Sequence, residues 1–317
     1  MKHIETFKIF ESKSEIEELK DKASKYKSYE ELRRNNPDLY RNIQKRGLQQ
    51  SIFPRKKKWT EEQFILEHKL WGKSIPEFLN WLKSKSNRYW VVLDTETTGL
   101  REDPYEVQLT QVSCLIVKYN ESSNSFEEVD SYDKKIKLTP ETLSLIKDPN
   151  VRIKKVLSFN HYGKSGTEYH EEQNVLEDFF KFISKYDNPV LVIQNAEFDM
   201  SFLNTRSPIV KFDNEVIDTK QIAQLFYLPT LQKLAETQPE FANMIKKIGL
   251  SDRDNGLISS SLSKIGPALG INMTNYHDAL VDCRLAVQMM EKMVEFLKNH
   301  QDVDIKKYQG QRIMTKR

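Results

Sequence analysis

An α/β domain preceded by a small all-α region is the fold class that the sequence predicts for this chain of 317 residues. From residue 88 onward, short runs rich in β-branched and aromatic residues alternate with amphipathic segments, a pattern typical of α/β domains. Residues 14–47 carry helical patterns and turn signals without a strand pattern. The composition, 38% hydrophobic and 30% charged, is that of a globular protein with room for one large domain and a smaller one.

The all-α region covers residues 14–47. Ser28 and Glu31 have the spacing of a capping box, in which each side chain bonds the backbone N–H of the other residue. Asn36 and Pro37 interrupt the helical pattern, which then resumes. Short helices joined by tight turns suggest a helix-turn-helix-like unit. This stretch also resembles the small helical modules that are appended to phage-encoded nucleases.

A second helical stretch covers residues 59–86. Its aromatic residues Trp71, Phe78 and Trp81, with Leu82, are expected to pack against the domain that follows, and stacking on nucleobases is the alternative. The expected organisation is a basic helical accessory module (1–58), a helical connector (59–86), a domain of strands and helices (87–300) and a basic C-terminal tail (301–317).

The net charge of +3 is unevenly distributed along the chain. Residues 1–86 contain 20 Lys or Arg against 13 Asp or Glu, whereas the remaining 231 residues contain 29 against 33. A basic region joined to a mildly acidic body favours a polyanionic partner, and a lysine-rich solvated surface is the alternative. The candidate nucleic-acid-binding residues of the accessory module are Arg33, Arg34, Arg41, Lys45, Arg46, Arg55, Lys56, Lys57 and Lys58.

Two classes of protein are disfavoured by composition. No run of about 18 apolar residues is present, and the first residues lack the apolar core of a secretion signal, so we expect no membrane contact. The two cysteines, Cys114 and Cys283, are too few for a disulfide framework or a cysteine metal cluster. A reducing, cytoplasmic location is therefore expected, which is the host cytoplasm if the chain is phage-encoded.

The elements of the α/β domain follow from period and punctuation. Strands are expected at Tyr89–Leu93, Val107–Tyr119, near Tyr132–Leu138, at Pro189–Ile193 and ending at Glu215–Thr219. Helices are expected after Thr139, at Glu171–Tyr186, after Gln194, and at Leu228–Gly249, Ser261–Leu269 and Asp278–Asn299. Residues 158–170 are expected to form a long loop.

Two carboxylates follow the first expected strand. Side chains two residues apart on a strand point to the same face, so Asp94 and Glu96 converge. Two like charges at the end of a buried strand are costly unless a cation lies between them. Asp282 poses the same problem, because it lies on the inward apolar stripe of the last helix, where an unpaired aspartate is rare.

Asp199 and His277 each have an alternative role when considered singly. Asp199 follows a buried strand and opens a helix, so it could serve as a helix cap. His277 precedes Asp282 by five residues, about 140° around an ideal helix, so the two cannot share one face. We therefore expect His277 to reach inward from the loop before the helix or from its first turn.

The order of these residues resembles that of the DEDD exonuclease superfamily, in its histidine-bearing, DnaQ-like branch. The matching segments are Asp94–Leu100, Asn195–Leu203 and Tyr276–Asp282, and the resemblance extends over about residues 88–298. It implies an RNase H-like mixed sheet flanked by helices. It also implies hydrolysis of phosphodiester bonds from the 3′ end of a nucleic acid.

Four carboxylates with one histidine and no cysteine suit oxygen-preferring ions, Mg²⁺ or Mn²⁺, rather than zinc. Two such ions about 3.5–4 Å apart can activate a water and stabilise the leaving oxygen. His277 can accept the proton of that water, since its ordinary pKa is about 6.5. By resemblance, Asp94 bridges both ions, Glu96 and Asp282 hold one, and Asp199 supports the other. The resemblance further implies that Thr95, Thr97 and Leu100 lie along the terminal nucleotide and that Phe198 contacts its base or sugar. Asn195 is a further candidate for substrate binding.

Single-stranded DNA with a free 3′ end is the substrate that we expect, and a polymerase or replication protein is a candidate partner. A 3′ exoribonuclease is the alternative, because this branch contains DNA and RNA enzymes with the same metal site. A non-catalytic nucleic-acid-binding or polymerase-accessory protein is a third interpretation. Such a protein needs none of the five candidate catalytic residues, whose joint presence argues against it.

Overall fold

The computed structural model describes residues 13–26, 32, 35–45, 70–99, 107–120, 123, 125–140, 142–143, 157, 162–163, 165–206, 214–249 and 258–309. The chain divides into two compact units, Met1–Trp59 and Thr60–Arg317. Each unit is described by itself.

The first unit contains two helices, α1 (Lys13–Ala23) and α3 (Pro37–Lys45). Asn36 starts α3, because its side-chain oxygen accepts a hydrogen bond from the Leu39 N–H at 3.1 Å. The helix expected to resume at Asp38 is therefore present and begins one residue earlier, at Pro37, whereas Ser28 and Glu31 lie outside the described residues. The helices share a small core that consists of Leu19, Ala23, Leu32, Leu39, Tyr40 and Ile43.

The second unit is built on a six-stranded sheet with the strand order β4-β3-β2-β1-β5-β6. The strands are β1 (Tyr89–Thr97), β2 (Leu109–Asn120), β3 (Ser125–Ile136), β4 (Tyr169–His170), β5 (Val190–Ile193) and β6 (Val216–Asp218). Strands β1, β2 and β3 pair antiparallel, whereas β5 runs parallel to both β1 and β6. The predicted fold class, an α/β protein with a mixed sheet flanked by helices, is confirmed.

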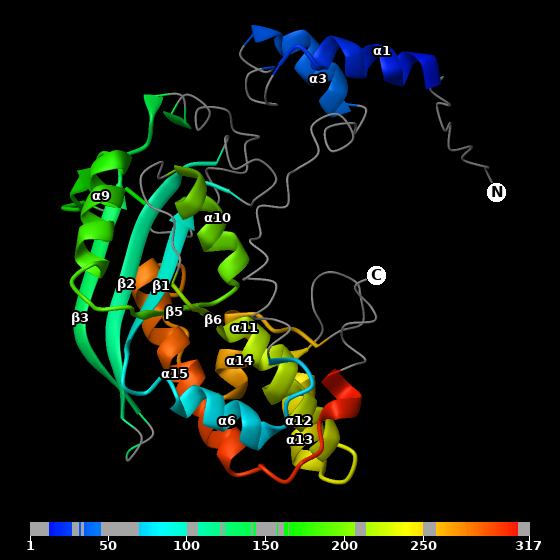
Figure 1. The fold of residues 1–317 in the computed structure, drawn as a ribbon, viewed down its shortest axis with the longest axis vertical. Coiled ribbons are helices and arrows are strands. Elements are labelled where there is room, and N and C mark those ends of the chain that lie inside the picture. Colours follow the sequence, from blue (N-terminus) through cyan, green and yellow to red (C-terminus); the bar gives the residue numbers. More distant parts are fainter. Residues whose placement is uncertain are drawn as a thin grey trace. The chain divides into compact units, whose positions relative to one another are not determined.

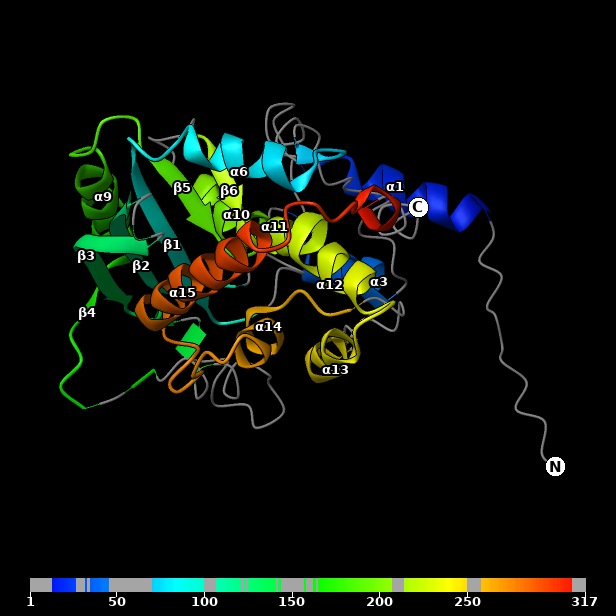
Figure 2. The same cartoon turned by 90° about the horizontal axis from the view of Figure 1, so that it is seen from below.

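Helices cover both faces of this sheet (Figures 1 and 2). One face packs against α9 (Glu172–Ile183) and α10 (Ala196–Arg206). The other packs against α15 (Ala279–Lys298), α6 (Ile75–Lys83) and a run of shorter helices. These are α11 (Thr219–Ile222), the π-helix η1 (Ala223–Tyr227), α12 (Leu228–Leu234), α13 (Pro239–Ile248) and α14 (Leu262–Ala268).

The alternation of β1 separates the two cores. Trp90 and Val92 belong to the core under α15, and Val91 and Leu93 belong to the core under α9 and α10. Both faces of β1 are therefore buried, which explains its continuous apolar sequence.

The connector and the C-terminal segment complete the core under α15. Phe78 is fully buried, and its ring lies 4.3 Å from that of Phe226 in η1, as expected for packing against the strands and helices that follow the connector. Trp71, by contrast, remains 38% exposed. Within the predicted C-terminal tail, Ile305 is buried in this core, and Gln309 donates a hydrogen bond to the Leu225 carbonyl at 2.8 Å.

Four expectations about the elements need correction. Strand β1 continues to Thr97, and β3 begins at Ser125 rather than near Tyr132, because its first half is solvent-exposed and has no apolar pattern to detect. Strand β4 lies inside the expected loop 158–170, where it pairs with Lys135 and Ile136. The expected helix 228–249 is two helices, separated by residues 235–238, and the first continues a helical run that begins at Thr219.

No helix in the described part of the chain is both long and apolar enough to cross a membrane.

Candidate active site

The second half of β1 carries Asp94 and Glu96 toward α15. They continue the alternation of Trp90 and Val92, so their side chains lie on the sheet face that α15 covers. The β1–β2 register shifts between Glu96 and Thr97, and such bulges redirect side chains at the ends of strands. Two carboxylates thus point to the same side at the point where the regular ladder ends.

The segment before α15 and the first turn of that helix supply the third and fourth groups. His277 lies two residues before the helix and has a left-handed backbone (φ 71°), which turns the chain sharply. Its N–H donates to Asp282 Oδ2 at 3.1 Å. Tyr276 packs its ring against the imidazole, with the ring centroids 4.1 Å apart. His277 therefore enters from the loop, as the helical geometry predicts, while Asp282 projects from the first turn.

Glu96, His277 and Asp282 form a group with metal-ligand character. One ligand atom from each lies within 4.8 Å of the others, although the three residues come from two distant segments. Asp282 Oδ1 is buried and has no hydrogen-bond partner among the described residues. An orphaned carboxylate oxygen beside a second carboxylate suits a hard cation, so these residues fit a divalent metal ion.

Asp199 approaches from the opposite face of the sheet. It is 2% exposed and lies in the first turn of α10. Both the backbone N–H and the hydroxyl of Thr95 donate to Asp199 Oδ1, at 2.9 and 2.7 Å. By the alternation along β1, the Thr95 side chain lies on the sheet face that α10 covers. Asp94 and Glu96 therefore point to one face of the sheet, and Thr95 between them binds Asp199 on the other. Asp94 and Asp199 lie outside the 4.8 Å group.

The carboxylates repel one another electrostatically. Burial, and then the charges of Asp199, Glu96 and Asp282, raise the pKa of Asp94 well above its usual range. Burial, and then Asp282 and Asp199, raise the pKa of Glu96 to about 8. Near neutral pH the cluster therefore retains protons unless a cation compensates its charge.

The other two carboxylates have pKa values close to neutrality. Burial raises the pKa of Asp199 to about 7 despite the opposing hydrogen bonds from Thr95. Burial also raises the pKa of Asp282 to about 7, against the hydrogen bond from His277. Perturbed carboxyl groups that converge from several elements are characteristic of functional sites.

Asn195 lies in a tight turn between β5 and α10, four residues before Asp199. Asn195 has a left-handed backbone (φ 67°), and Asp218 Oδ1 accepts its N–H at 2.9 Å. Asp218 Oδ2 accepts the N–H of Ala196 at 3.1 Å, and Lys220 Nζ donates to Asn195 Oδ1 at 2.7 Å. With its oxygen turned to Lys220, the Asn195 amide has its NH₂ group left as donor.

Three more residues were predicted to contact the substrate, namely Thr97, Phe198 and Leu100. The Thr97 hydroxyl donates to the Gly99 carbonyl at 2.6 Å, which shapes the turn after β1. Phe198 is partly buried, and its ring lies 5.1 Å from that of Phe202 in the core under α10. Leu100 lies outside the described residues.

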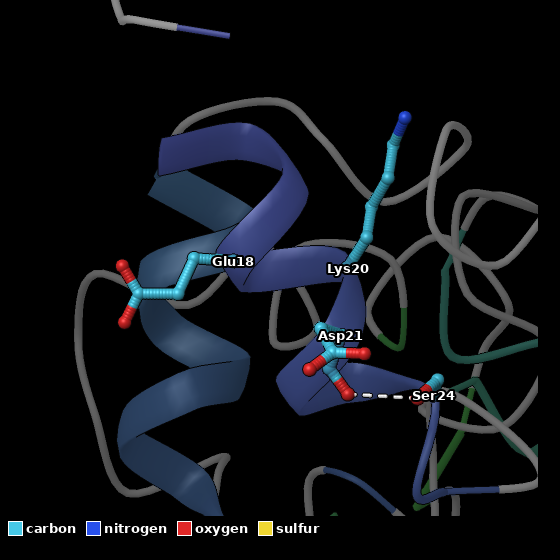
Figure 3. A pocket seen from close by; sticks show the side chains of 4 residues that line it. All are labelled: Glu18, Lys20, Asp21 and Ser24. Carbon is cyan, nitrogen blue, oxygen red and sulfur yellow. Dashed lines mark hydrogen bonds between the residues drawn. The ribbon is translucent and has the colours of Figure 1, made fainter. Parts of the chain in front are cut away.

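Little of the predicted accessory site can be described. Arg41 is exposed on α3 and forms an ion pair with Asp38 at 2.9 Å, and Lys45 is the last residue of that helix. The other accessory residues, Arg33, Arg34, Arg46, Arg55, Lys56, Lys57 and Lys58, lie outside the described residues. Figure 3 shows an open hollow on α1, lined by Glu18, Lys20, Asp21 and Ser24, which holds none of the predicted site residues.

Three residues near the carboxylates are absent from the sequence prediction. Lys135 Nζ lies 3.0 Å from Asp278 Oδ2 and donates to Gln111 Oε1 at 2.9 Å. Burial alone would raise the pKa of Asp278, but the hydrogen bond and charge of Lys135 bring it below its usual range. In the sequence, the signal for these contacts is limited to the position of Asp278 beside His277, because Gln111 and Lys135 lie on two other strands.

A family described as Exonuclease (RNase T) matches residues 91–290. DNA polymerase III of the PolC type from Staphylococcus haemolyticus is 24% identical over 225 residues, which is 68% of this chain and 12% of that protein. The PolC-type enzyme from Halalkalibacterium halodurans is 31% identical over 146 residues, which is 45% of this chain and 9% of that protein. The matched part of this chain thus spans only about a tenth of the length of these relatives.

Two solved structures are similar in part. Escherichia coli exonuclease I in a complex with single-stranded DNA gives a TM-score of 0.42 at 15% identity, covering 68% of this chain and 42% of that chain. The nuclease domain of 3′hExo, a DEDDh family member bound to rAMP, gives 0.41 at 14% identity, covering 66% and 92%. The family match covers more than half of the sequence and agrees with the RNase H-like sheet, and this chain belongs to the Exonuclease (RNase T) family of nucleases.

Proposed function

We propose that this protein is a metal-dependent 3′–5′ exonuclease that removes nucleotides from single-stranded DNA. The observation that carries the proposal is the convergence of Glu96, His277 and Asp282 within 4.8 Å at the end of β1. Asp94 lies on the same sheet face, and Asp199 is held at the other side of the strand by Thr95. Family membership supplies the reaction class, hydrolysis of a phosphodiester bond at a chain end.

Divalent ions, Mg²⁺ or Mn²⁺, would supply charge compensation and water activation when bound by Asp94, Glu96, Asp199 and Asp282. His277 is proposed to accept the proton of the attacking water through its imidazole. The bond from its N–H to Asp282 couples the position of the base to that of a carboxylate. The closeness of His277 to Glu96 also permits a role as a metal ligand. The two roles predict different effects of a His277 substitution on metal binding.

DNA is favoured over RNA as the substrate because the relatives named above are DNA polymerases. A replication protein is accordingly the proposed partner, and the cytoplasm the proposed location. An exoribonuclease is the second candidate, because none of the site contacts described above distinguishes a 2′-hydroxyl.

The decisive experiment is digestion of single-stranded DNA and RNA labelled at either the 3′ or the 5′ end. With Mg²⁺ or Mn²⁺, we expect mononucleotides from the 3′ end of DNA, no reaction in EDTA, and no rescue by Ca²⁺. Asp94→Ala should be inactive. Asp178→Ala, which removes an exposed carboxylate of α9, should match the wild type. Release from the 5′ end, activity in excess EDTA, or equal digestion by Asp94→Ala would each contradict the proposal.

For the basic accessory module, we propose contacts with the phosphate backbone of longer DNA. Removal of residues 1–58 should weaken binding to long single strands and flatten the salt dependence, since fewer counterions are then released. Turnover on a short oligonucleotide should change little, because the proposed catalytic residues all lie in the second unit. An unchanged salt slope would show that the basic charge is only a solvated surface.

A further inference from the structure

We propose that Gln111 and Lys135 are positioning residues, which hold the segment carrying His277 and Asp282 against the sheet. The inference rests on the exonuclease function proposed above. It concerns side chains on two strands that supply none of the proposed catalytic groups.

A row of three polar side chains crosses the sheet beneath the start of α15. Glu96 on β1 pairs with Gln111 on β2, and Gln111 pairs with Lys135 on β3. Directly paired residues on adjacent strands point to the same face, about 5 Å apart. The row therefore runs from a proposed metal-binding carboxylate through an amide to an ammonium group.

Gln111 and Lys135 bind the residues at the start of α15. Lys135 Nζ binds Asp278 Oδ2 at 3.0 Å, and both side chains are largely shielded, with exposures of 15% and 23%. Gln111 is 1% exposed, and its Oε1 accepts hydrogen bonds from Lys135 Nζ and from the Ala279 N–H at 3.3 Å. Its Nε2 donates to Asp133 Oδ1 at 2.8 Å, which fixes the orientation of the amide.

The residues bound by Gln111 and Lys135 lie between His277 and Asp282 in the sequence. Asp278 and Ala279 follow His277 directly and precede Asp282 by one helical turn. Because the His277 N–H also bonds Asp282, the loop and the first turn of α15 form one connected unit. Release of Asp278 would let this unit shift, and a displacement of about 1 Å at a catalytic group can cost about 100-fold in rate.

A second ion pair between α15 and β3 provides a matched control. Arg284 binds Glu128 at 3.1 Å, but both side chains are almost half exposed, at 45% and 44%. Such exposed pairs contribute little to stability. If Lys135 merely helps to attach the helix to the sheet, loss of either pair should have similar consequences.

The first test compares kinetics. Lys135→Met should lower kcat by about 10- to 100-fold with KM within about twofold, whereas Arg284→Met should change neither by more than about twofold. Lys135→Arg should recover most of the activity, because a guanidinium can donate to the same Asp278 oxygen. A kcat of Lys135→Met within twofold of wild type would overturn the proposal. So would a rise in KM alone, which would indicate direct contact with the nucleic acid.

A second test does not depend on activity. Hydrogen exchange of peptides covering residues 275–283 should be faster in Lys135→Met than in wild type, and unchanged in Arg284→Met. Equal protection in all three proteins would show that the row does not hold this segment, whatever the enzyme does. If exchange accelerates while the wild type digests no nucleic acid, the proposed function fails and the anchoring stands.

A double-mutant cycle completes the design. The Lys135→Met and Asp278→Ala losses in kcat should not multiply, because each removes the same contact. Multiplying losses would assign the two residues to separate roles and contradict the proposal.

Discussion

Asp199 and Asp282 lie on the two sides of β1, and they are held in different ways. Each has a pKa of about 7 because of burial. Asp199 receives two hydrogen bonds from Thr95, whereas Asp282 receives one from His277 and retains a buried oxygen without a partner among the described residues. The α10 side of the site is therefore organised by hydrogen bonds within the protein, and the proposed metal ion, when bound, would complete the α15 side.

This difference has a structural origin. Thr95 lies on β1 beyond its pairing with β5 but still pairs with Val112 of β2, so the strand fixes its N–H and hydroxyl before any ligand arrives. Asp282 and His277 instead lie where a loop with left-handed residues enters a helix, and they are connected to the sheet through side chains. Loops of this kind are stabilised by fewer backbone contacts than strands, so their order is more sensitive to ligands.

Between the two sides of the site, the largest effect is expected from Asp282→Asn. This change should lower turnover by at least about 1,000-fold and strongly weaken Mn²⁺ binding, since it removes the charge of a carboxylate that keeps a buried oxygen without a partner among the described residues. Isothermal titration with Mn²⁺ and single-turnover digestion measure the two quantities. Asp199→Asn should also lower turnover but should weaken metal binding less. Equal losses of metal affinity in the two variants would remove the distinction between the two sides.

His277→Ala should come next, with turnover reduced by about 100- to 10,000-fold, the usual contribution of a general base. The affinity for Mn²⁺ should barely change, because the carboxylates remain. Calorimetry of the variant therefore separates the two roles of the imidazole. Abolished metal binding would make His277 a ligand instead of the base.

Thr95→Val tests the organised side and should have a smaller effect. It removes the hydroxyl donor of Asp199 but keeps the backbone N–H, so we expect a loss of about tenfold in turnover and about 1–3 kcal/mol in the free energy of unfolding. Thr95→Ser keeps the hydroxyl and serves as the control. Full activity of Thr95→Val would show that the backbone bond alone positions Asp199.

The smallest effect concerns stability as a function of pH. The folded pKa values of Glu96, Asp199 and Asp282 are raised to about 8, 7 and 7, above those of the unfolded chain. Their contribution to stability is thus fully present below about pH 4 and is lost as pH rises through about 8. In EDTA, the melting temperature should therefore be lower at pH 8.5 than at pH 5.5.

Added Mn²⁺ should recover more of the melting temperature at the higher pH, where the carboxylates are ionised. Glu96→Gln should flatten the pH dependence, whereas Glu177→Gln on the exposed face of α9 should leave it unchanged. A melting temperature in EDTA that rises over this pH range would show that these carboxylates are not destabilised by burial.

The spacing of apolar residues along the sequence was sufficient to predict β1, β2, β5, α9, α10 and α15 in their order. It also predicted which face of the last helix points into the core. It also determined that Asp94 and Glu96 share a face, since an i, i+2 spacing on a strand has no other outcome. The position of His277 before the helix followed from the 100° step per residue. These features are local, and local geometry is fixed by the spacing of residues along the chain.

Only the tertiary structure decided which distant side chains meet. Thr95 and Asp199 are 104 residues apart, and Lys135 and Asp278 are 143 apart. The register between strands determines such contacts, and it depends on how whole faces pack. For the same reason, the exposed first half of β3 and the two-residue strand β4 gave no signal. Burial creates the apolar pattern that a sequence can show, and polar contacts between distant strands leave no such pattern.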